Sequence, residues 1–252
     1  MTHLSECRFL QKIKTVIFDC DGVLWLMEQL IDGALDLVEY LKSNNIRVYF
    51  VTNNSGKTGP EYKEKFNRLG FKNISEDSII GAARIAAVCL KKLGHKNVFV
   101  VGSKAIDKEL EKVGILTTRH LEETARERLT LKGKDMFDMK LSDDVDGVLC
   151  GMDYDINYLK ICMAASYVVS RNLKVYATNP DAALPNPSGL IYPGAGAIKG
   201  AIEGVIDREV DCVFGKPNKY GSELIDDFDG ETSMMVGDRI GEIFKNKESI
   251  LS

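Results

Sequence analysis

The sequence predicts an α/β fold built around a doubly wound parallel sheet. Short runs of β-branched and aromatic residues at 15–18 and 47–51 have the composition of buried strands. Between them, residues 32–41 place apolar side chains at helical spacing. A strand, a helix and a second strand in this order form a βαβ unit, whose two strands run parallel.

The same alternation continues along the chain. Helices are expected over residues 60–69 and 82–93, and Gly94 has the position of a C-terminal cap for the second helix. Further strands are expected at residues 97–102, 147–151, 174–178, 211–215 and 232–237. Residues 119–144 are polar and rich in charge, and we expect an exposed helix or loop there.

Length, charge and cysteine content narrow the class of protein. The 252 residues, of which 44% are hydrophobic, are enough for one large domain or two smaller ones. The 33 basic and 37 acidic residues are mixed along the chain, so no basic stripe predicts nucleic-acid binding. No apolar run predicts a membrane span or a signal peptide. The six cysteines lack metal-type spacing, and we expect a reduced, cytoplasmic protein.

Polar side chains follow several expected strands at the point where each strand ends. Asp19 follows the first strand, Thr52 ends the second, and Lys216 and Asp238 come just after two later ones. In an open α/β sheet, ligands bind in the crevice at the carboxyl ends of the strands. The sequence therefore predicts that these four residues face one site.

Asp19 and Asp21 form a pair of carboxylates that extended chain projects to the same side. One can attack phosphorus while the other protonates the leaving oxygen and later activates water. A plain turn is the alternative interpretation, because Asp and Gly22 both favour turns. A calcium-binding EF-hand loop is disfavoured, because apolar Val23 and Leu30 stand where oxygen ligands are expected.

Carboxylate attack on a phosphate dianion brings like charges together. The repulsion between two unit charges 4 Å apart is about 4 kcal/mol at an effective dielectric constant near 20. Cations must compensate this repulsion. A Mg²⁺ ion held by Asp19, Asp21 and Asp238 is one expected cation, because Mg²⁺ prefers carboxylate and phosphate oxygens. Lys216 is the second, as a point charge on both the phosphate and Asp19.

The run Thr52, Asn53, Asn54 and Ser55 offers a hydroxyl, amides and backbone N–H groups at a strand end. These groups suit phosphate oxygens, and we expect Thr52, Asn53 and Asn54 to bind substrate. Taken alone, the run is also ordinary loop material. The run favours a phosphate site because it occurs together with the other three polar segments, in this order, in one chain.

Those four segments in that order resemble the haloacid dehalogenase superfamily. Residues 19–25 and 51–55 are similar to its phosphoglycolate, pyridoxal-phosphate and p-nitrophenyl-phosphate phosphatase branch. The likeness covers nearly the whole chain and implies a Rossmann-like core. It implies these roles: Asp19 as nucleophile, Asp21 as general acid and base, Thr52 and Asn53 as phosphate ligands, Lys216 as the charge-neutralising lysine, and Asp238 as a Mg²⁺ ligand.

The resemblance also implies an inserted α/β cap domain over residues 94–211, which closes over a catalytic core formed by residues 1–93 and 212–252. Asn179 and Asp181 lie in a segment that looks like the part of the cap that reaches toward the substrate. We therefore expect them to contact the substrate, and we expect a homodimer formed through the cap.

The main hypothesis is a Mg²⁺-dependent phosphatase that hydrolyses small phosphomonoesters, phosphoglycolate first, through an aspartyl phosphate. After Asp238 the chain reads Ile-Gly-Glu-Ile where the family usually has Leu-Asp-Thr-Asp, and it ends at Ser252, before the family's last helix and strand. The alternative is thus a truncated phosphatase-like scaffold with weak or no activity. A receiver-type signalling domain is disfavoured by the large insertion between Thr52 and Lys216.

Overall fold

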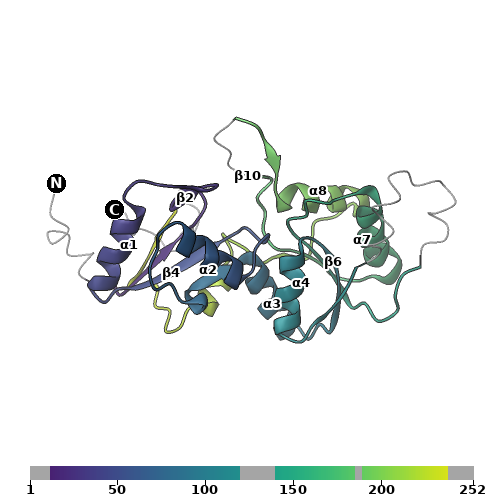
Figure 1. Cartoon of the computed structure of the whole chain (residues 1–252). Coiled ribbons are helices and arrows are strands. Elements are labelled where there is room, and N and C mark those ends of the chain that lie inside the picture. Colours follow the sequence, from purple (N-terminus) through teal and green to yellow (C-terminus); the bar gives the residue numbers. More distant parts are fainter. Residues whose placement is uncertain (1–11, 120–139, 185–188, 238–252) are drawn as a thin grey trace.

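Two parallel β-sheets lie side by side in the computed structural model, which describes residues 12–119, 140–184 and 189–237 (Figure 1). The first sheet has the order β13-β1-β4-β5, with every neighbouring pair parallel. Its strands are β1 (Thr15–Phe18), β4 (Arg47–Thr52), β5 (Ile79–Gly81) and β13 (Ser233–Val236). Parallel sheets with flanking helices confirm the predicted α/β class.

The first sheet is covered on both faces, as a parallel sheet requires. Helices α1 (Ala34–Ser43) and α2 (Gly59–Arg68) pack on the face that carries Phe18 and Phe50. A capping box between Thr58 and Glu61 fixes the start of α2. The opposite face packs on α3 (Ala82–Lys92).

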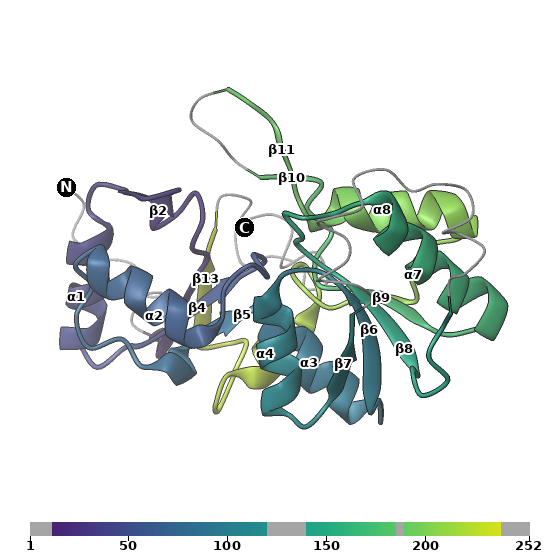
Figure 2. The ribbon, with the colours of Figure 1, turned by 45° about the vertical axis from the view of Figure 1, so that its right-hand side comes forward.

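The second sheet has the order β12-β9-β8-β6-β7 and is also parallel throughout. Its strands are β6 (Asn97–Val101), β7 (Leu116–Thr118), β8 (Gly147–Cys150), β9 (Val175–Ala177) and β12 (Cys212–Val213). Helices α3 and α4 (Lys104–Lys112) cover one face, while α7 (Tyr158–Arg171) and α8 (Ala195–Ile206) cover the other (Figure 2).

Helix α3 lies between the two sheets and joins their cores. One apolar cluster contains Ile17 and Val51 of the first sheet, Ile85 of α3, and Val100 and Leu149 of the second sheet. The sheets are therefore held together by packing as well as by the chain that connects them. The division into a core and a cap over residues 94–211 stays a prediction, and β12, just beyond its second boundary, pairs with β9 of the second sheet.

Several small elements were not predicted. Besides strands β5 and β7, they are the antiparallel pair β2 (Trp25–Leu26) and β3 (Gln29–Leu30), the pair β10 (Ala183–Leu184) and β11 (Tyr192–Pro193), and the 3₁₀ turns η3 (Glu76–Ser78) and η4 (Lys219–Leu224). The hairpin of β10 and β11 projects from the body of the molecule (Figure 2).

Some sequence predictions fall on parts of the chain outside the described residues. Most of the polar stretch at 119–144 is among them, and so are Asp238 and the residues that follow it. Among the helices that the structure describes, none has both the length and the apolar character needed to cross a bilayer.

Candidate active site

Asp19 and Lys216 form an ion pair where the two sheets meet. Lys216 Nζ lies 2.6 Å from Asp19 Oδ1, and the backbone N–H of Cys20 donates to the same oxygen at 2.7 Å. Asp19 follows β1 of the first sheet, whereas Lys216 follows β12 of the second. The two side chains are only 17% and 13% exposed, so this ion pair is shielded from most of the solvent.

Asp21 lies in the tight turn that follows Asp19. Its Oδ1 accepts a hydrogen bond from the indole N–H of Trp25 at 2.8 Å, and the Thr52 hydroxyl lies 3.5 Å from its Oδ2. Gly22 has φ +88°, a left-handed conformation that glycine adopts without strain. The turn thus brings the carboxylate of Asp21 next to Thr52, at the end of β4.

The loop that follows β4 is fixed by the second sheet through Ser55, which is fully buried. The backbone N–H of Met152 and the hydroxyl of Thr178 both donate to Ser55 Oγ, at 3.0 and 3.1 Å. The hydroxyl of Ser103 donates to the Ser55 carbonyl at 3.0 Å. These three partners come just after β8, β9 and β6, so three strand ends of the second sheet hold the loop expected to bind phosphate.

The Asn53 side chain links that loop to Lys216 and to Asp181. Its Oδ1 accepts from the Lys216 backbone N–H at 2.8 Å, and its Nδ2 donates to Asp181 Oδ2 at 3.0 Å. The Asn179 amide in turn donates to the Asn53 carbonyl at 2.6 Å. The structure therefore brings Asn179 and Asp181 to the loop at 52–55, and it leaves the Asn53 amide engaged with protein groups.

Gly215 allows the strand before Lys216 to approach this loop closely. A Cβ at Gly215 would lie 2.6 Å from the Thr178 carbonyl and 2.7 Å from Asn53 Oδ1. No side chain fits in that space, so the close approach of the two segments requires glycine at position 215. The Gly215 backbone N–H also donates to the Thr178 carbonyl at 2.7 Å.

Cys20, between the two aspartates, is fully buried and packs in the core on the face of the first sheet that α1 and α2 cover. Burial, together with the charges of Asp19 and Asp21, raises the pKa of its thiol well above the usual value. The thiolate is therefore disfavoured, and Cys20 is an apolar core residue.

The donor chemistry of the two aspartates fits a hard divalent cation. The Asp19 carboxylate and the Asp21 backbone carbonyl offer the oxygen ligands that Mg²⁺ prefers. Within residues 12–119, 140–184 and 189–237, no group of three or more His, Cys, Asp and Glu side chains is arranged to hold a metal. The third predicted ligand, Asp238, lies outside those residues, so the complete ligand set stays a prediction.

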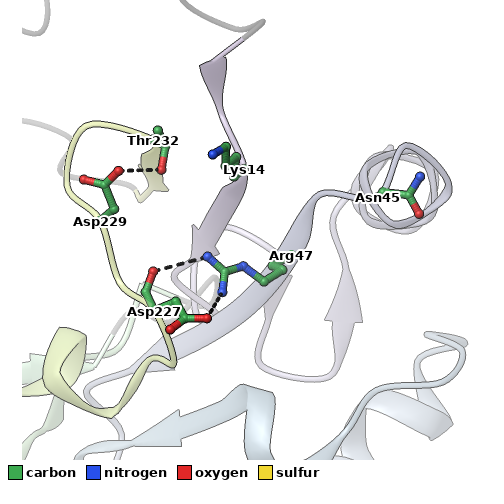
Figure 3. A pocket seen from close by; sticks show the side chains of 6 residues that line it. All are labelled: Lys14, Asn45, Arg47, Asp227, Asp229 and Thr232. Atoms are coloured by element: carbon green, nitrogen blue, oxygen red, sulfur yellow. Dashed lines mark hydrogen bonds and ion pairs between the residues drawn. The ribbon is translucent and has the colours of Figure 1, made fainter.

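A hollow of about 460 Å³ lies at the other end of the first sheet. Its lining consists of Lys14, Asn45, Arg47, Asp227, Asp229 and Thr232 (Figure 3). Lys14 and Arg47 stand at the amino ends of β1 and β4, opposite the strand ends that carry Asp19 and Thr52. Arg47 is engaged there by the Asp226 carbonyl at 3.0 Å. We therefore take Asp19 and its neighbours, and not this hollow, as the candidate active site.

Comparison with known proteins identifies the family of the chain. The haloacid dehalogenase-like hydrolase family matches residues 16–116. Phosphoglycolate phosphatase 2 of Arabidopsis thaliana is 35% identical over 90% of this chain and 77% of its own length. Glycerol-3-phosphate phosphatase of Mus musculus is 32% identical over 92% of this chain and 74% of its own. The crystal structure of a 4-nitrophenylphosphatase from Thermotoga maritima superposes with a TM-score of 0.76 at 28% identity, covering 94% of this chain and 82% of that one.

Fold and comparisons together define a phosphoric monoester hydrolase with a parallel α/β fold. The chain belongs to the haloacid dehalogenase-like hydrolases, which confirms the family that the four sequence segments resemble.

Most of the predicted site residues within the described part of the chain lie together. Asp19, Asp21, Thr52 and Lys216 meet at one edge, and Asn179 with Asp181 reaches it from the second sheet. The sequence did not single out the roles of Ser55 and Trp25. Ser55 belongs to the quoted run at 52–55, but its partners stand far along the chain, and no local pattern predicts them.

We expect that Ser55→Ala lowers the free energy of unfolding by about 1–3 kcal/mol, because it leaves the buried Met152 N–H without its acceptor. Urea denaturation measures this difference. Ser43→Ala is the matched control, since Ser43 is exposed and its loss should change stability by less than about 0.5 kcal/mol. Equal unfolding midpoints for the two variants would contradict the role given to Ser55.

Proposed function

We propose that this chain hydrolyses small phosphomonoesters with the help of Mg²⁺ and that the phosphoryl group is transiently bound to Asp19 as an aspartyl phosphate. The observation that carries this proposal is the Asp19–Lys216 ion pair with Asp21 beside it. A nucleophilic carboxylate, a cation on it and a second carboxylate are the groups that phosphoryl transfer to an aspartate needs.

The proposed reaction uses the chain's own groups in a fixed order. An oxygen of Asp19 attacks phosphorus, and protonated Asp21 gives its proton to the leaving oxygen. Asp21, now a carboxylate, then takes a proton from the water that attacks the phosphorus, which frees Asp19 and phosphate. Lys216 stabilises negative charge during both steps. Mg²⁺, held by the carboxylates of Asp19 and Asp238 and by the backbone carbonyl of Asp21, would supply further charge compensation on the phosphate.

We infer that Thr52 and the backbone of the following loop contact the phosphate, while Asn53 and Asn54 shape that loop. Support comes from the hydrogen bonds of the two amides, because Asn54 Oδ1 accepts from the Gly56 N–H at 2.8 Å. Residues 94–211 act in this proposal as the cap that selects among substrates. The preferred substrate is a small phosphate ester of the kind named in the relatives, with phosphoglycolate first.

Asp19→Asn should lower Mg²⁺-dependent hydrolysis of 4-nitrophenyl phosphate by at least ~10³-fold, because an amide cannot act as the nucleophile. EDTA should stop the wild-type reaction, and added Mg²⁺ should restore it. Asp32→Asn, at an exposed position away from the strand ends, is the control and should keep wild-type turnover. Retained activity in Asp19→Asn would remove this mechanism, and an inactive wild-type chain would favour the scaffold alternative.

Asp181→Ala should change the ranking of substrates, because Asp181 reaches the loop at 52–55 from the second sheet. We expect kcat/KM for phosphoglycolate, glycerol 3-phosphate and 4-nitrophenyl phosphate to shift unequally, by about tenfold for the most affected ester. Asp36→Ala, on the exposed side of α1, serves as the control. The same proportional loss for all three esters would sink the assignment of Asp181 to substrate selection.

We also propose that the chain forms a homodimer through the cap, with residues 190–192 at the contact. Leu190, Ile191 and Tyr192 are 62%, 81% and 43% exposed, a concentration of apolar surface at the start of β11 in the β10–β11 hairpin. Sedimentation should then give about twice the monomer mass for the wild type, and Ile191→Asp should shift the protein to monomer. A wild-type monomer at micromolar concentration would refute this contact.

A further inference from the structure

The indole of Trp25 is bonded to the second carboxylate of the site. Trp25 is fully buried, and it stands four residues after Asp21. Its Nε1–H donates to Asp21 Oδ1 at 2.8 Å. A buried indole N–H needs an acceptor, and here the acceptor is a reacting group.

Packing holds the Trp25 ring in one place. Phe66 meets it edge-on at 4.9 Å between ring centroids, and Phe71 does so at 6.4 Å. The Lys65 ammonium lies 4.3 Å from the ring centroid and donates to the Met27 carbonyl at 2.6 Å. Lys65 is itself only 5% exposed, so cation and ring are fixed together. The indole N–H is therefore a rigid donor aimed at Asp21.

This donor makes the two oxygens of Asp21 different. Oδ1 faces the indole N–H, and a proton on Oδ1 would compete with that bond. Oδ2 lies on the side of Thr52, 3.5 Å from its hydroxyl, at the end of β4. The indole bond thus leaves Oδ2 as the carboxyl oxygen that is turned toward Thr52 and the proposed phosphate site.

We propose that Trp25 is a positioning residue for proton transfer to the leaving group, acting through Asp21. This inference rests on the proposed function. The proton on Asp21 Oδ2 passes to the leaving oxygen as the bond from phosphorus to that oxygen breaks and the bond from phosphorus to Asp19 forms. An alcohol leaves, and Asp21 remains as a carboxylate whose Oδ1 still accepts from Trp25.

The leaving group decides how much this proton transfer matters. An alkoxide is strongly basic and leaves poorly unless it is protonated, whereas 4-nitrophenolate is stable as an anion and needs little help. The ratio kcat/KM reports all steps up to the departure of the leaving group. A misplaced Asp21 should therefore slow alkyl phosphates much more than 4-nitrophenyl phosphate, while general damage to the fold would slow both.

The test compares glycerol 3-phosphate with 4-nitrophenyl phosphate in wild type and Trp25→Phe, which keeps an aromatic ring and removes the N–H. We expect kcat/KM to fall about 10- to 100-fold for the alkyl ester and less than about threefold for the aryl ester. Phe99→Leu is the control, because it removes a buried aromatic ring from the core of the second sheet, where Phe99 packs on Tyr167 and not on Trp25. It should leave the ratio of the two values at the wild-type level.

A second form of the test avoids a change of shape. The chain has a single tryptophan, so growth on a benzothienyl analogue, in which sulfur replaces the N–H, alters position 25 alone. The analogue protein should show the same selective loss for the alkyl ester. In an Asp21→Asn background the analogue should cause no further loss, because the two groups act as one unit.

The possible results distinguish a failure of the role proposed for Trp25 from a failure of the proposed phosphatase activity. Equal losses for both esters in Trp25→Phe and in the analogue protein would overturn the role of Trp25 and leave the proposed function standing. A wild-type protein that hydrolyses neither ester would overturn the proposed function itself.

Discussion

The candidate active site depends on one ion pair whose partners come from different sheets. Asp19 ends a strand of the first sheet, and Lys216 follows a strand of the second, yet their charged atoms lie 2.6 Å apart. A partly buried carboxylate beside a phosphate is electrostatically unfavourable without a cation. The second sheet must therefore remain against the first for the site to be complete.

Two further features hold the two sheets against each other next to the ion pair. Helix α3 packs between them in a shared apolar cluster, and the buried Ser55 joins the loop after β4 to three strand ends of the second sheet. Large rigid-body separation of the sheets would break these hydrogen bonds and expose their buried groups.

The sequence was informative wherever a signal is local. Hydrophobic runs predicted β1 and β4, and the position of Gly94 predicted the cap of α3, where its φ is +88°. The pair of carboxylates, Asp19 and Asp21, could be recognised because the two residues are only two positions apart in the sequence. The sheet to which each strand belongs was harder to predict, because strand pairing depends on contacts that are distant in the sequence. For example, β12 precedes the predicted site residue Lys216 but pairs with β9 of the second sheet.

The supporting contacts of the site could not be predicted for the same reason. Ser55 finds its partners near residues 103, 152 and 178, and the amide of Asn53 finds Lys216. Trp25 is close to Asp21 in sequence, but its bond depends on the shape of a turn and on packing against Phe66. Composition and periodicity indicate burial of such side chains and not the direction of their hydrogen bonds.

The central claim is that phosphate is carried on Asp19 during turnover. Borohydride reduces an acyl phosphate to the alcohol, so it converts a phosphorylated aspartate into homoserine. The direct measurement is to quench the protein with borohydride during turnover of 4-nitrophenyl phosphate and to map its peptides by mass spectrometry. The account predicts homoserine at position 19 in the wild type and none without substrate. Homoserine at position 21, or steady turnover with no reduced residue, would contradict it.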